Sequence, residues 1–396
     1  MFLHNSLNSV LAILAILVSV PIVVFIMECF AAILLGKSAK SSIKEQPTTA
    51  ILIPAHNEEP HIHLVVREAK KQLGTNDRLV VIADNCSDNT AELARDAGAE
   101  VLERTNAIER GKGYALDAGL QYLSDTGNPE VVLFLDADCV MSEGTLTNLT
   151  SLAWATGRPV QAKYLMEQES KPGLKDRIST FALKVKNHVR FLGLSRLGGH
   201  CLLTGSGMAF PWSVINQVSL VGSINADDMK LTVDLALKDL VPLYCENSLV
   251  IGRLMENEAA QSQRTRWEHG HLQMISVEVP KLIRAWLRQP RFAYLLLALD
   301  ISIPPLSLLV TIWLTATIAS LALTFVLNLS WLPVAVLLVA GIALTTTVLA
   351  TWKRFGTTDL PFKDLIAIPF YILGKLPIYS KFLINPQAGW ATTERD

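Results

Sequence analysis

An unbroken apolar run that ends in two acids, at residues 131–138, constrains the fold more than any other part of this chain. Five apolar residues in a row predict a strand buried on both faces, which is typical of a parallel sheet covered by helices. Asp136 and Asp138 follow at the carboxyl end of that strand, where the ligand crevice of an α/β sheet opens. Neighbouring carboxylates are costly unless they meet a cation, and a divalent metal with oxygen ligands satisfies that need. A strand ending in two solvated turn acids is the alternative interpretation.

Apolar residues gather in three long stretches of the chain, which explains why 50% of the 396 residues are hydrophobic and only 18% are charged. Because each stretch is long enough to cross ~30 Å of hydrocarbon, we expect a transmembrane helix at 7–35, a transmembrane region at 292–326 and a transmembrane helix at 331–352. Basic residues follow the first apolar stretch, precede the second and follow the third, whereas the short connection between the second and the third carries none. The positive-inside rule therefore places the globular domain in the cytoplasm.

Two further segments are expected at the membrane surface. Residues 271–291 alternate large apolar side chains with basic ones, which predicts an amphipathic interface helix. Residues 361–384 are apolar but interrupted by lysines and prolines, which favours an interfacial or re-entrant segment, with a fourth span as the alternative. The net charge of −1 argues against nucleic acid as a partner. The five cysteines include no Cys-x-x-Cys, so neither a zinc site nor a disulfide framework is indicated.

Residues 48–270 have the composition of one large α/β domain. Predicted strands cover 49–54, 78–83, 100–102 and 131–135, and predicted helices cover 61–73, 89–98 and 113–124. This alternation indicates βαβ units and a parallel sheet. Since the carboxyl ends of parallel strands meet at one edge, the acids that follow these strands should collect there.

Three residues near the predicted strand ends and helix starts are candidates for binding a nucleotide. Glu58 and Asp84 follow the first two strands, and a carboxylate there can accept hydrogen bonds from a base or a ribose. Helix capping is the alternative role in these loops. Lys112 lies between two glycines at a predicted helix start, which suits an approach to phosphate, although a solvated lysine in a surface loop fits as well.

Further candidates follow along the chain. Asp227 and Asp228 open a predicted helix, where acids are ordinary capping residues, but a metal-bound carboxylate leaves proton abstraction to a separate base. Gln263, Arg266 and Trp267 form a compact group in which the arginine can neutralise a diphosphate and the indole can stack on a sugar ring. An amphipathic helix at the membrane surface is the alternative for that group. The small residues of 204–207 would permit close approach of a ligand to the backbone, or mark a glycine bulge in a strand.

The order of the acidic and basic motifs in this chain resembles that of the processive-type family 2 glycosyltransferases. The motifs are, in turn, Asp84, Asp136-x-Asp138, the Asp227 and Asp228 pair, and the Gln-x-x-Arg-Trp motif. The processive-type group includes cellulose, hyaluronan and chitin-oligosaccharide synthases and bacterial exopolysaccharide transferases. The resemblance implies a GT-A fold, that is, an α/β, Rossmann-like nucleotide-diphospho-sugar transferase domain flanked by transmembrane helices. It also implies a UDP-sugar donor, a Mg²⁺ or Mn²⁺ cofactor, and a multi-pass protein of the bacterial inner (plasma) membrane.

The resemblance also implies roles for individual residues. Asp84 would hold the uridine, Asp136 the ribose or phosphate side of the nucleotide, and Asp138 the metal ion. Asp228 would be the catalytic base, although the family usually has Glu-Asp where this chain has Asp-Asp. The remaining candidates are Glu58 and Lys112 for the nucleotide sugar, and Asp227, Gln263, Arg266 and Trp267 for the acceptor and diphosphate.

The sequence thus predicts a metal-dependent, inverting glycosyltransferase that moves a sugar to a membrane-associated glycan or lipid-linked acceptor in polysaccharide biosynthesis. Only two clear spans follow the catalytic domain, so threading a long polymer would call for an oligomer or for export partners. Two alternatives stay open. One is a single-addition glycosyltransferase for a ceramide- or hopanoid-type lipid, and the other is a non-catalytic, nucleotide-binding subunit of a polysaccharide export complex.

Overall fold

The computed structural model describes residues 2–36, 46–167, 172–220, 227–253 and 257–384. The chain divides into two compact units. One is helical and consists of Met1–Gly36, Pro172–Leu197 and His271–Gln387; the other is an α/β unit of Lys37–Lys171, Gly198–Gly270 and Ala388–Asp396. Residues 172–197 lie inside the range predicted for the catalytic domain, but they group with the helical unit.

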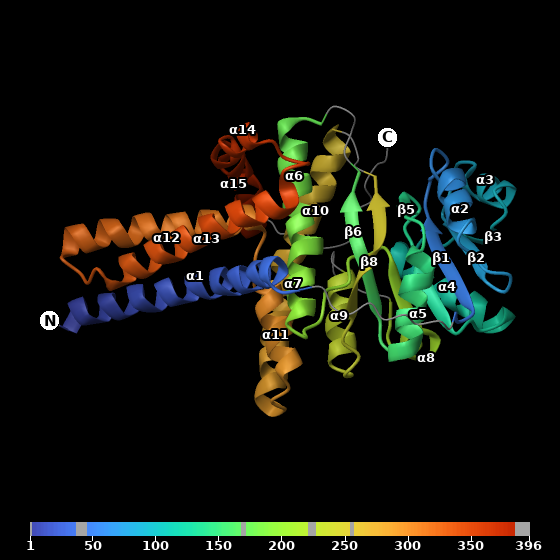
Figure 1. Ribbon diagram of the computed structural model, residues 1–396, viewed down its shortest axis with the longest axis horizontal. Coiled ribbons are helices and arrows are strands. Elements are labelled where there is room, and N and C mark those ends of the chain that lie inside the picture. The colour runs from blue at the N-terminus through green and yellow to red at the C-terminus, as the bar shows by residue number, and fades with distance from the viewer. Residues whose placement is uncertain (1, 37–45, 168–171, 221–226, 254–256, 385–396) are drawn as a thin grey trace. The chain divides into compact units, whose positions relative to one another are not determined.

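The α/β unit is built on one eight-stranded sheet with the order β3-β2-β1-β4-β7-β6-β8-β5 (Figure 1). Its strands are β1 (Thr49–Ala55), β2 (Arg78–Asp84), β3 (Glu100–Arg104), β4 (Val131–Phe134), β5 (Cys139–Met141), β6 (Val160–Met166), β7 (Met208–Pro211) and β8 (Leu243–Gly252). The first four strands pair in parallel, as predicted, whereas β7 runs antiparallel between β4 and β6.

Strands β4 and β7 at the centre of the sheet are apolar at every position and so have no polar face, and helices cover both faces of the sheet. Ile51 and Ile53 of β1 pack into one buried cluster, and Leu52 packs into another, as the two-residue period of a strand requires. The first cluster includes residues of α2 (Ile62–Lys70), α3 (Thr90–Asp96) and α5 (Thr145–Thr156); the second includes residues of α4 (Lys112–Thr126), α8 (Trp212–Ile215) and α9 (Asp227–Ala236). The predicted fold class is confirmed.

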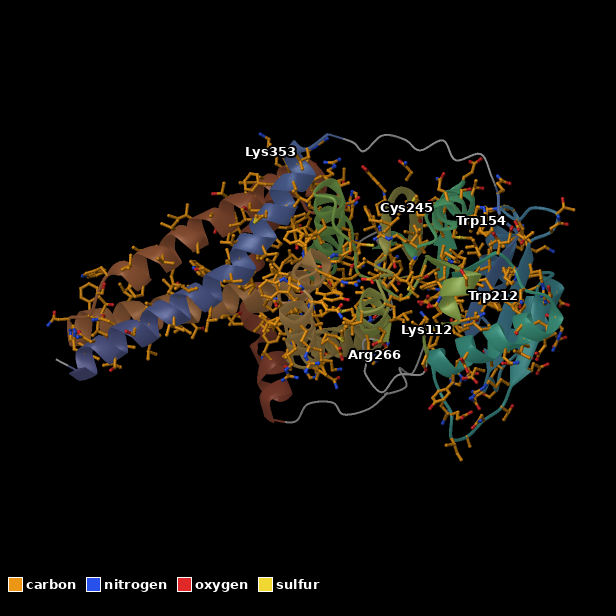
Figure 2. The ribbon with its side chains drawn as sticks, turned by 90° about the horizontal axis from the view of Figure 1, so that it is seen from below. Lys112, Trp154, Trp212, Cys245, Arg266 and Lys353 are labelled. Carbon is orange, nitrogen blue, oxygen red and sulfur yellow. The ribbon has the colours of Figure 1, made fainter. Side chains whose placement is uncertain are left out.

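In the described part of the helical unit, three helices are long and apolar enough to cross a membrane, at His4–Leu34, Leu306–Leu327 and Leu332–Gly356. They belong to α1 (Phe2–Leu34), α12 (Leu306–Leu327) and α13 (Leu332–Thr351) with η2 (Trp352–Gly356), and they pack side by side (Figure 1). Figure 2 shows that their side chains are mostly carbon, with Lys353 at the end of the third. The structure divides the region predicted at 292–326 into α11 (Phe292–Ile301) and α12.

The other helices of this unit are α6 (Leu174–Lys184), η1 (Val185–Arg190), α7 (Phe191–Arg196), α14 (Phe362–Leu365) and α15 (Ile368–Ile384). Helix α10 (Asn257–Arg288) begins in the α/β unit and continues into the helical unit, so the interface helix predicted at 271–291 is the second half of a longer helix. Helices α14 and α15 occupy the segment predicted at 361–384. The placement of these segments at a membrane surface stays a prediction.

Glycines allow two close helix contacts in the helical unit. A β-carbon at Gly193 of α7 would lie 1.8 Å from the carbonyl oxygen of Glu28 in α1, so the two backbones touch. A β-carbon at Gly341 of α13 would lie 1.9 Å from the ring of Trp313 in α12, whose indole N–H donates to the Leu337 carbonyl at 2.7 Å. Small residues and interhelical hydrogen bonds are typical of helix packing in lipid.

A buried cluster of three charged side chains joins segments far apart in the chain. Arg190 at the end of η1 donates from Nε to the Glu28 carboxylate at 2.6 Å. Its Nη2 donates to the Asp300 carbonyl at 2.9 Å and also pairs with the Asp300 carboxylate. The exposed fractions are 6% for Arg190 and 1% for each acid. Since a buried charge is tolerated only with a partner, this cluster fixes α1, η1 and α11 to one another.

Replacing Arg190 should therefore destabilise the protein strongly. We expect Arg190→Met to cost about 3–5 kcal/mol, because it leaves two buried carboxylates without their guanidinium. Glu28→Gln should cost less, since the Arg190 and Asp300 pair remains. The measurement is the thermal unfolding of the detergent-solubilised protein.

Arg95→Met is the matched control for this prediction. The pair between Arg95 and Glu103 is half exposed, at 50% and 61%, and such surface pairs contribute about 0–1 kcal/mol. Equal shifts in Tm for Arg190→Met and Arg95→Met would contradict the structural role of the buried cluster.

Candidate active site

Asp84 ends strand β2 and is held by a neighbouring guanidinium that the sequence did not reveal. Arg104 lies opposite Asp84 in the β2–β3 pair, and its Nη1 donates to Asp84 Oδ1 at 2.7 Å. The side-chain amide of Asn85 donates to the same oxygen at 3.0 Å. Asp84 is 5% exposed, so its carboxylate is fixed before any ligand arrives.

The loops after β1 and β2 turn through left-handed asparagines. Asn57 and Asn85 both have φ 53°, a conformation that asparagine tolerates better than other residues because its short side chain bonds locally. Asn57 Oδ1 accepts the Ser87 N–H at 2.8 Å, and Asn85 Oδ1 accepts the Asn106 N–H at 2.9 Å. Each asparagine thus ties its own loop to the loop after the next strand.

Glu58 is buried, at 3% exposed, and its backbone holds the start of α2. Its N–H donates to Thr90 Oγ1 at 2.8 Å, and its carbonyl accepts the N–H of Ile62, the first residue of α2, at 2.9 Å. Asp88 caps the next helix by accepting the Thr90 N–H at 3.1 Å. A role for the Glu58 carboxylate in nucleotide binding stays a prediction.

Lys112 is the central cation of the site. It begins helix α4, and its Nζ donates to the Gly205 carbonyl at 2.6 Å and pairs with the Asp136 carboxylate. Burial opposes the charge of Lys112, but the negative charges of Asp136 and Asp228 outweigh that effect and raise its pKa. Lys112 is therefore positively charged, and it holds Asp136 rather than lying in a solvated surface loop.

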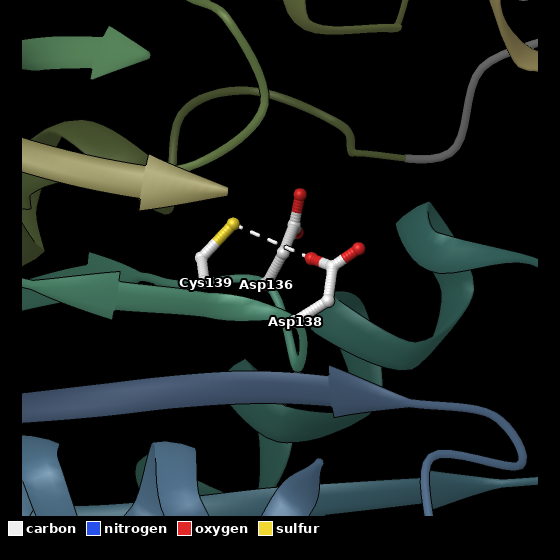
Figure 3. A group of neighbouring side chains, drawn as sticks. All are labelled: Asp136, Asp138 and Cys139. Carbon is white, nitrogen blue, oxygen red and sulfur yellow. Dashed lines mark hydrogen bonds between the residues drawn. The ribbon is translucent and has the colours of Figure 1, made fainter. Parts of the chain in front are cut away.

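Asp136 and Asp138 lie in the turn between β4 and β5 (Figure 3). The Asp136 N–H donates to Ser206 Oγ at 3.0 Å, and the Cys139 thiol donates to Asp138 Oδ1 at 3.3 Å. One possible ligand atom from each of Asp136, Asp138 and Cys139 lies within 4.8 Å of the others. Two carboxylates fit Mg²⁺ or Mn²⁺. Burial raises the pKa of the Cys139 thiol well above its usual range, so we assign the metal to the carboxylates.

Asp228 lies beside the same cation. Its Oδ2 and Lys112 Nζ are each 3.5 Å from the position that a β-carbon would take at Gly205. Asp228 is the second residue of α9, and its Oδ1 accepts the Met229 N–H at 2.8 Å, which orients the carboxylate. Gly205 has φ +87°, a left-handed conformation that favours glycine. The structure therefore brings Asp228 close to Lys112, which pairs with Asp136, although 116 residues separate Asp228 from Lys112 in sequence.

The loop that carries Gly205 and Ser206 is held from strand β6 by Gln161, which is fully buried. Gln161 Nε2 donates to the Ser206 carbonyl at 2.9 Å, and its Oε1 accepts the Thr204 N–H at 2.9 Å. Sequence reasoning missed this residue. A polar amide between two apolar neighbours in a strand was the available signal.

Arg266 and Trp267 lie on the first half of α10, and both are half-buried (Figure 2 labels Arg266). The side chains of Asp227 and Gln263 lie outside the described part of the structure. The acceptor and diphosphate roles of these four residues stay predictions.

Comparison with models of known protein families shows the family to which this chain belongs. The family described as "Glycosyl transferase family 2" matches residues 50–203, and "Glycosyl transferase family group 2" matches residues 131–344, more than half of the chain. The chain belongs to glycosyl transferase family group 2. Every site residue with a described side chain lies within one or both of these matches.

Two curated proteins resemble part of this family 2 chain. "Probable glycosyltransferase YdaM" from Bacillus subtilis (strain 168) is 30% identical over 107 residues, which make up 25% of this chain and 24% of that protein. "4,4'-diaponeurosporenoate glycosyltransferase" from Staphylococcus haemolyticus (strain JCSC1435) is 29% identical over 109 residues, which make up 26% of this chain and 28% of that protein. The chain thus matches about a quarter of the length of these relatives.

A solved structure supports the fold over nearly the whole chain. The mannosyltransferase PcManGT from Pyrobaculum calidifontis aligns with 92% of this chain and 99% of its own, with a TM-score of 0.56 and 17% identity. This likeness confirms the predicted GT-A fold with flanking apolar helices. The processive subtype stays a prediction.

Metal binding at this site should depend on pH. Burial and the charge of Asp136 raise the pKa of Asp138 to about 6, so the carboxylate is ionised above that pH and must lose a proton below it. We expect the affinity for Mn²⁺ to fall about tenfold for each pH unit below 6. Titration calorimetry at several pH values measures this.

Two variants complete the metal-binding prediction. Asp138→Asn should abolish most of the Mn²⁺ affinity, whereas Asp125→Asn, at an exposed site on α4, should leave both the affinity and its pH profile unchanged. An affinity that stays constant through pH 6 would contradict the assigned role of Asp138.

Proposed function

We propose that this protein is a membrane-bound, inverting glycosyltransferase that moves a sugar from a UDP-sugar to a membrane-associated glycan or lipid-linked acceptor in polysaccharide biosynthesis. One observation carries this proposal. In a chain of family group 2, Lys112 joins Asp136 to the Gly205 carbonyl, and Asp228 lies at the same glycine. A metal-binding acid pair and a separate carboxylate thus occur side by side, which is the equipment that direct glycosyl transfer needs.

The leaving diphosphate would lie at the turn between β4 and β5. When bound by Asp138, Mg²⁺ or Mn²⁺ supplies positive charge that stabilises the leaving group. Lys112 adds a second positive charge and holds Asp136 in place. Metal dependence is consistent with the similar mannosyltransferase, whose structure was solved with GDP-Man and Mn²⁺.

Asp228 would act as the general base. Its carboxylate takes the proton of an acceptor hydroxyl while that oxygen attacks the anomeric carbon. The bond between the anomeric carbon and the diphosphate oxygen breaks, and its electron pair leaves with the nucleoside diphosphate. A single displacement inverts the anomeric centre and needs no covalent intermediate with the enzyme.

The remaining predicted residues would bind the rest of the two substrates. Asp84, fixed by Arg104, accepts hydrogen bonds from the uridine, and Glu58 contributes from the loop after β1. Arg266 neutralises the diphosphate and Trp267 stacks on a sugar ring, and Asp227 and Gln263 are the further residues proposed for the acceptor and diphosphate.

The three apolar helices would anchor the protein in the bacterial inner membrane as a multi-pass protein. The distribution of basic residues supports a cytoplasmic catalytic domain. A nucleotide sugar made in the cytoplasm would then meet an acceptor held at the inner leaflet.

Single addition to a lipid is the second candidate function. The relative named for 4,4'-diaponeurosporenoate acts, by that name, on one defined molecule rather than on a polymer. Product analysis separates the two functions, because repeated transfer gives a ladder of oligomers and single addition gives one product. The acids gathered around Lys112 argue against the third alternative, a subunit without catalytic activity.

Removing either the metal ligand or the base should stop the reaction. We expect Asp138→Ala and Asp228→Asn each to lower the release of UDP from a UDP-sugar by at least about a thousandfold, since each removes a group that acts in the transition state. The assay screens UDP-glucose, UDP-N-acetylglucosamine, UDP-galactose and GDP-mannose with Mn²⁺ and membrane extract.

Asp234→Asn is the matched control for Asp228→Asn. Asp234 lies on the same helix and pairs with Lys230, four residues before it. No role in binding the metal or the substrates is proposed for Asp234. Its activity should equal that of the original protein. Retained turnover in purified Asp228→Asn would reject the base, and no turnover of any donor by the original protein would reject the function.

A further inference from the structure

Arg253 is an arginine beside the metal acids that sequence reasoning did not single out. It directly follows strand β8, whose last residue, Gly252, pairs with Cys139 of β5. The Arg253 N–H donates to the Asp138 carbonyl at 3.2 Å. Because β5 and β8 are antiparallel, this bond continues their pairing by one residue beyond Cys139 and Gly252. The sheet therefore places the backbone of Arg253 next to that of the metal-binding Asp138.

The guanidinium of Arg253 contacts the uncharged imidazole ring of His61. Its Nη1 lies 2.9 Å from Nδ1 and 2.6 Å from Nε2 of His61, which directly precedes α2. Partial burial and the charge of Arg253 lower the pKa of His61, so the imidazole is uncharged near pH 7. An exposed arginine thus contacts a group that offers hydrogen-bonding capacity and no compensating charge.

This partner sets Arg253 apart from the arginines whose roles are structural. The ion pairs of the described residues include those that five other arginines form with carboxylates, namely Arg78, Arg95, Arg104, Arg177 and Arg190. Among the described residues, no carboxylate lies within ion-pairing distance of Arg253. The described residues therefore leave its positive charge without a paired carboxylate, so that it can pair with a bound anion.

Charge balance indicates what that group is. Asp136, Asp138 and Asp228 carry three negative charges, which Lys112 and a divalent cation would together offset. A nucleotide sugar adds the two negative charges of its diphosphate, and departure of the sugar adds a third. Arginine suits this anion because its planar fork of N–H groups matches phosphate oxygens in pairs.

Building on the proposed function, we propose that Arg253 is a further diphosphate-binding residue, whose guanidinium moves from His61 to the diphosphate of the nucleotide beside Asp138. The exchange gives up a contact with a neutral ring and gains bidentate hydrogen bonds to an anion, in which both partners are ionised. His61 is then a positioning residue that holds the guanidinium at the edge of the site.

Nucleotide binding tests this proposal directly. The affinities of the full chain for UDP, GDP and uridine are measured by titration calorimetry with Mn²⁺. We expect Arg253→Gln to weaken the binding of the preferred diphosphate tenfold or more and to leave uridine binding unchanged. Arg67→Gln is the matched control, because Arg67 is an exposed arginine of α2, and it should bind like the original protein.

A second pair of variants separates binding from a structural effect. His61→Glu gives Arg253 a carboxylate partner, so it should hold the guanidinium back and weaken UDP or GDP binding several-fold, whereas His61→Gln should not. Equal diphosphate affinity in Arg253→Gln and the original protein overturns this assignment and leaves the proposed function intact. Failure of the original protein to bind UDP or GDP at all overturns both.

Discussion

The ion pair between Lys112 and Asp136, together with the hydrogen bond to the Gly205 carbonyl, organises the whole site. These contacts join three segments that are 24 and 93 residues apart in the chain. Without them, the carboxylates of Asp136, Asp138 and Asp228 would repel one another at the edge of the sheet. A fixed ammonium group allows the acids to gather before a metal ion arrives, so the protein binds the ion with a preformed site rather than with mobile loops.

Much of the fold and of the metal-binding acid pair could be predicted from the sequence, because the buried strand and the acids that follow it are adjacent in the chain. An apolar run followed by Asp136-x-Asp138 defines both the buried strand and the edge at which its acids emerge. The partners of those acids could not be predicted in the same way. Ser206 and Gly205 reach Asp136 and Lys112 only because β7 inserts antiparallel beside β4, and nothing in the local sequence specifies that neighbour. Arg104 likewise meets Asp84 through the lateral order of the strands.

The division of the chain into units was also beyond local reasoning. Residues 172–197 have the composition of a globular domain, yet they pack with the apolar helices. The deciding features are few: a glycine at 193 that lets α7 touch α1, and an arginine at 190 that meets two acids in other helices. Helical periodicity shows that a segment has a buried face, but it does not show which partner covers that face. In this chain, Gly193 and Arg190 determine which helices cover residues 172–197.

The cluster around Arg190 has a consequence for how the protein is made. Glu28 in α1 leaves the ribosome well before the guanidinium that neutralises it, which follows 162 residues later. At typical rates of synthesis, this delay lasts roughly 8 to 30 seconds. During that interval an acidic side chain sits in an apolar helix without its permanent counter-charge. Until η1 has been synthesised, the Glu28 carboxyl must therefore be accommodated in another way, for example by taking up a proton or by contact with water or lipid headgroups.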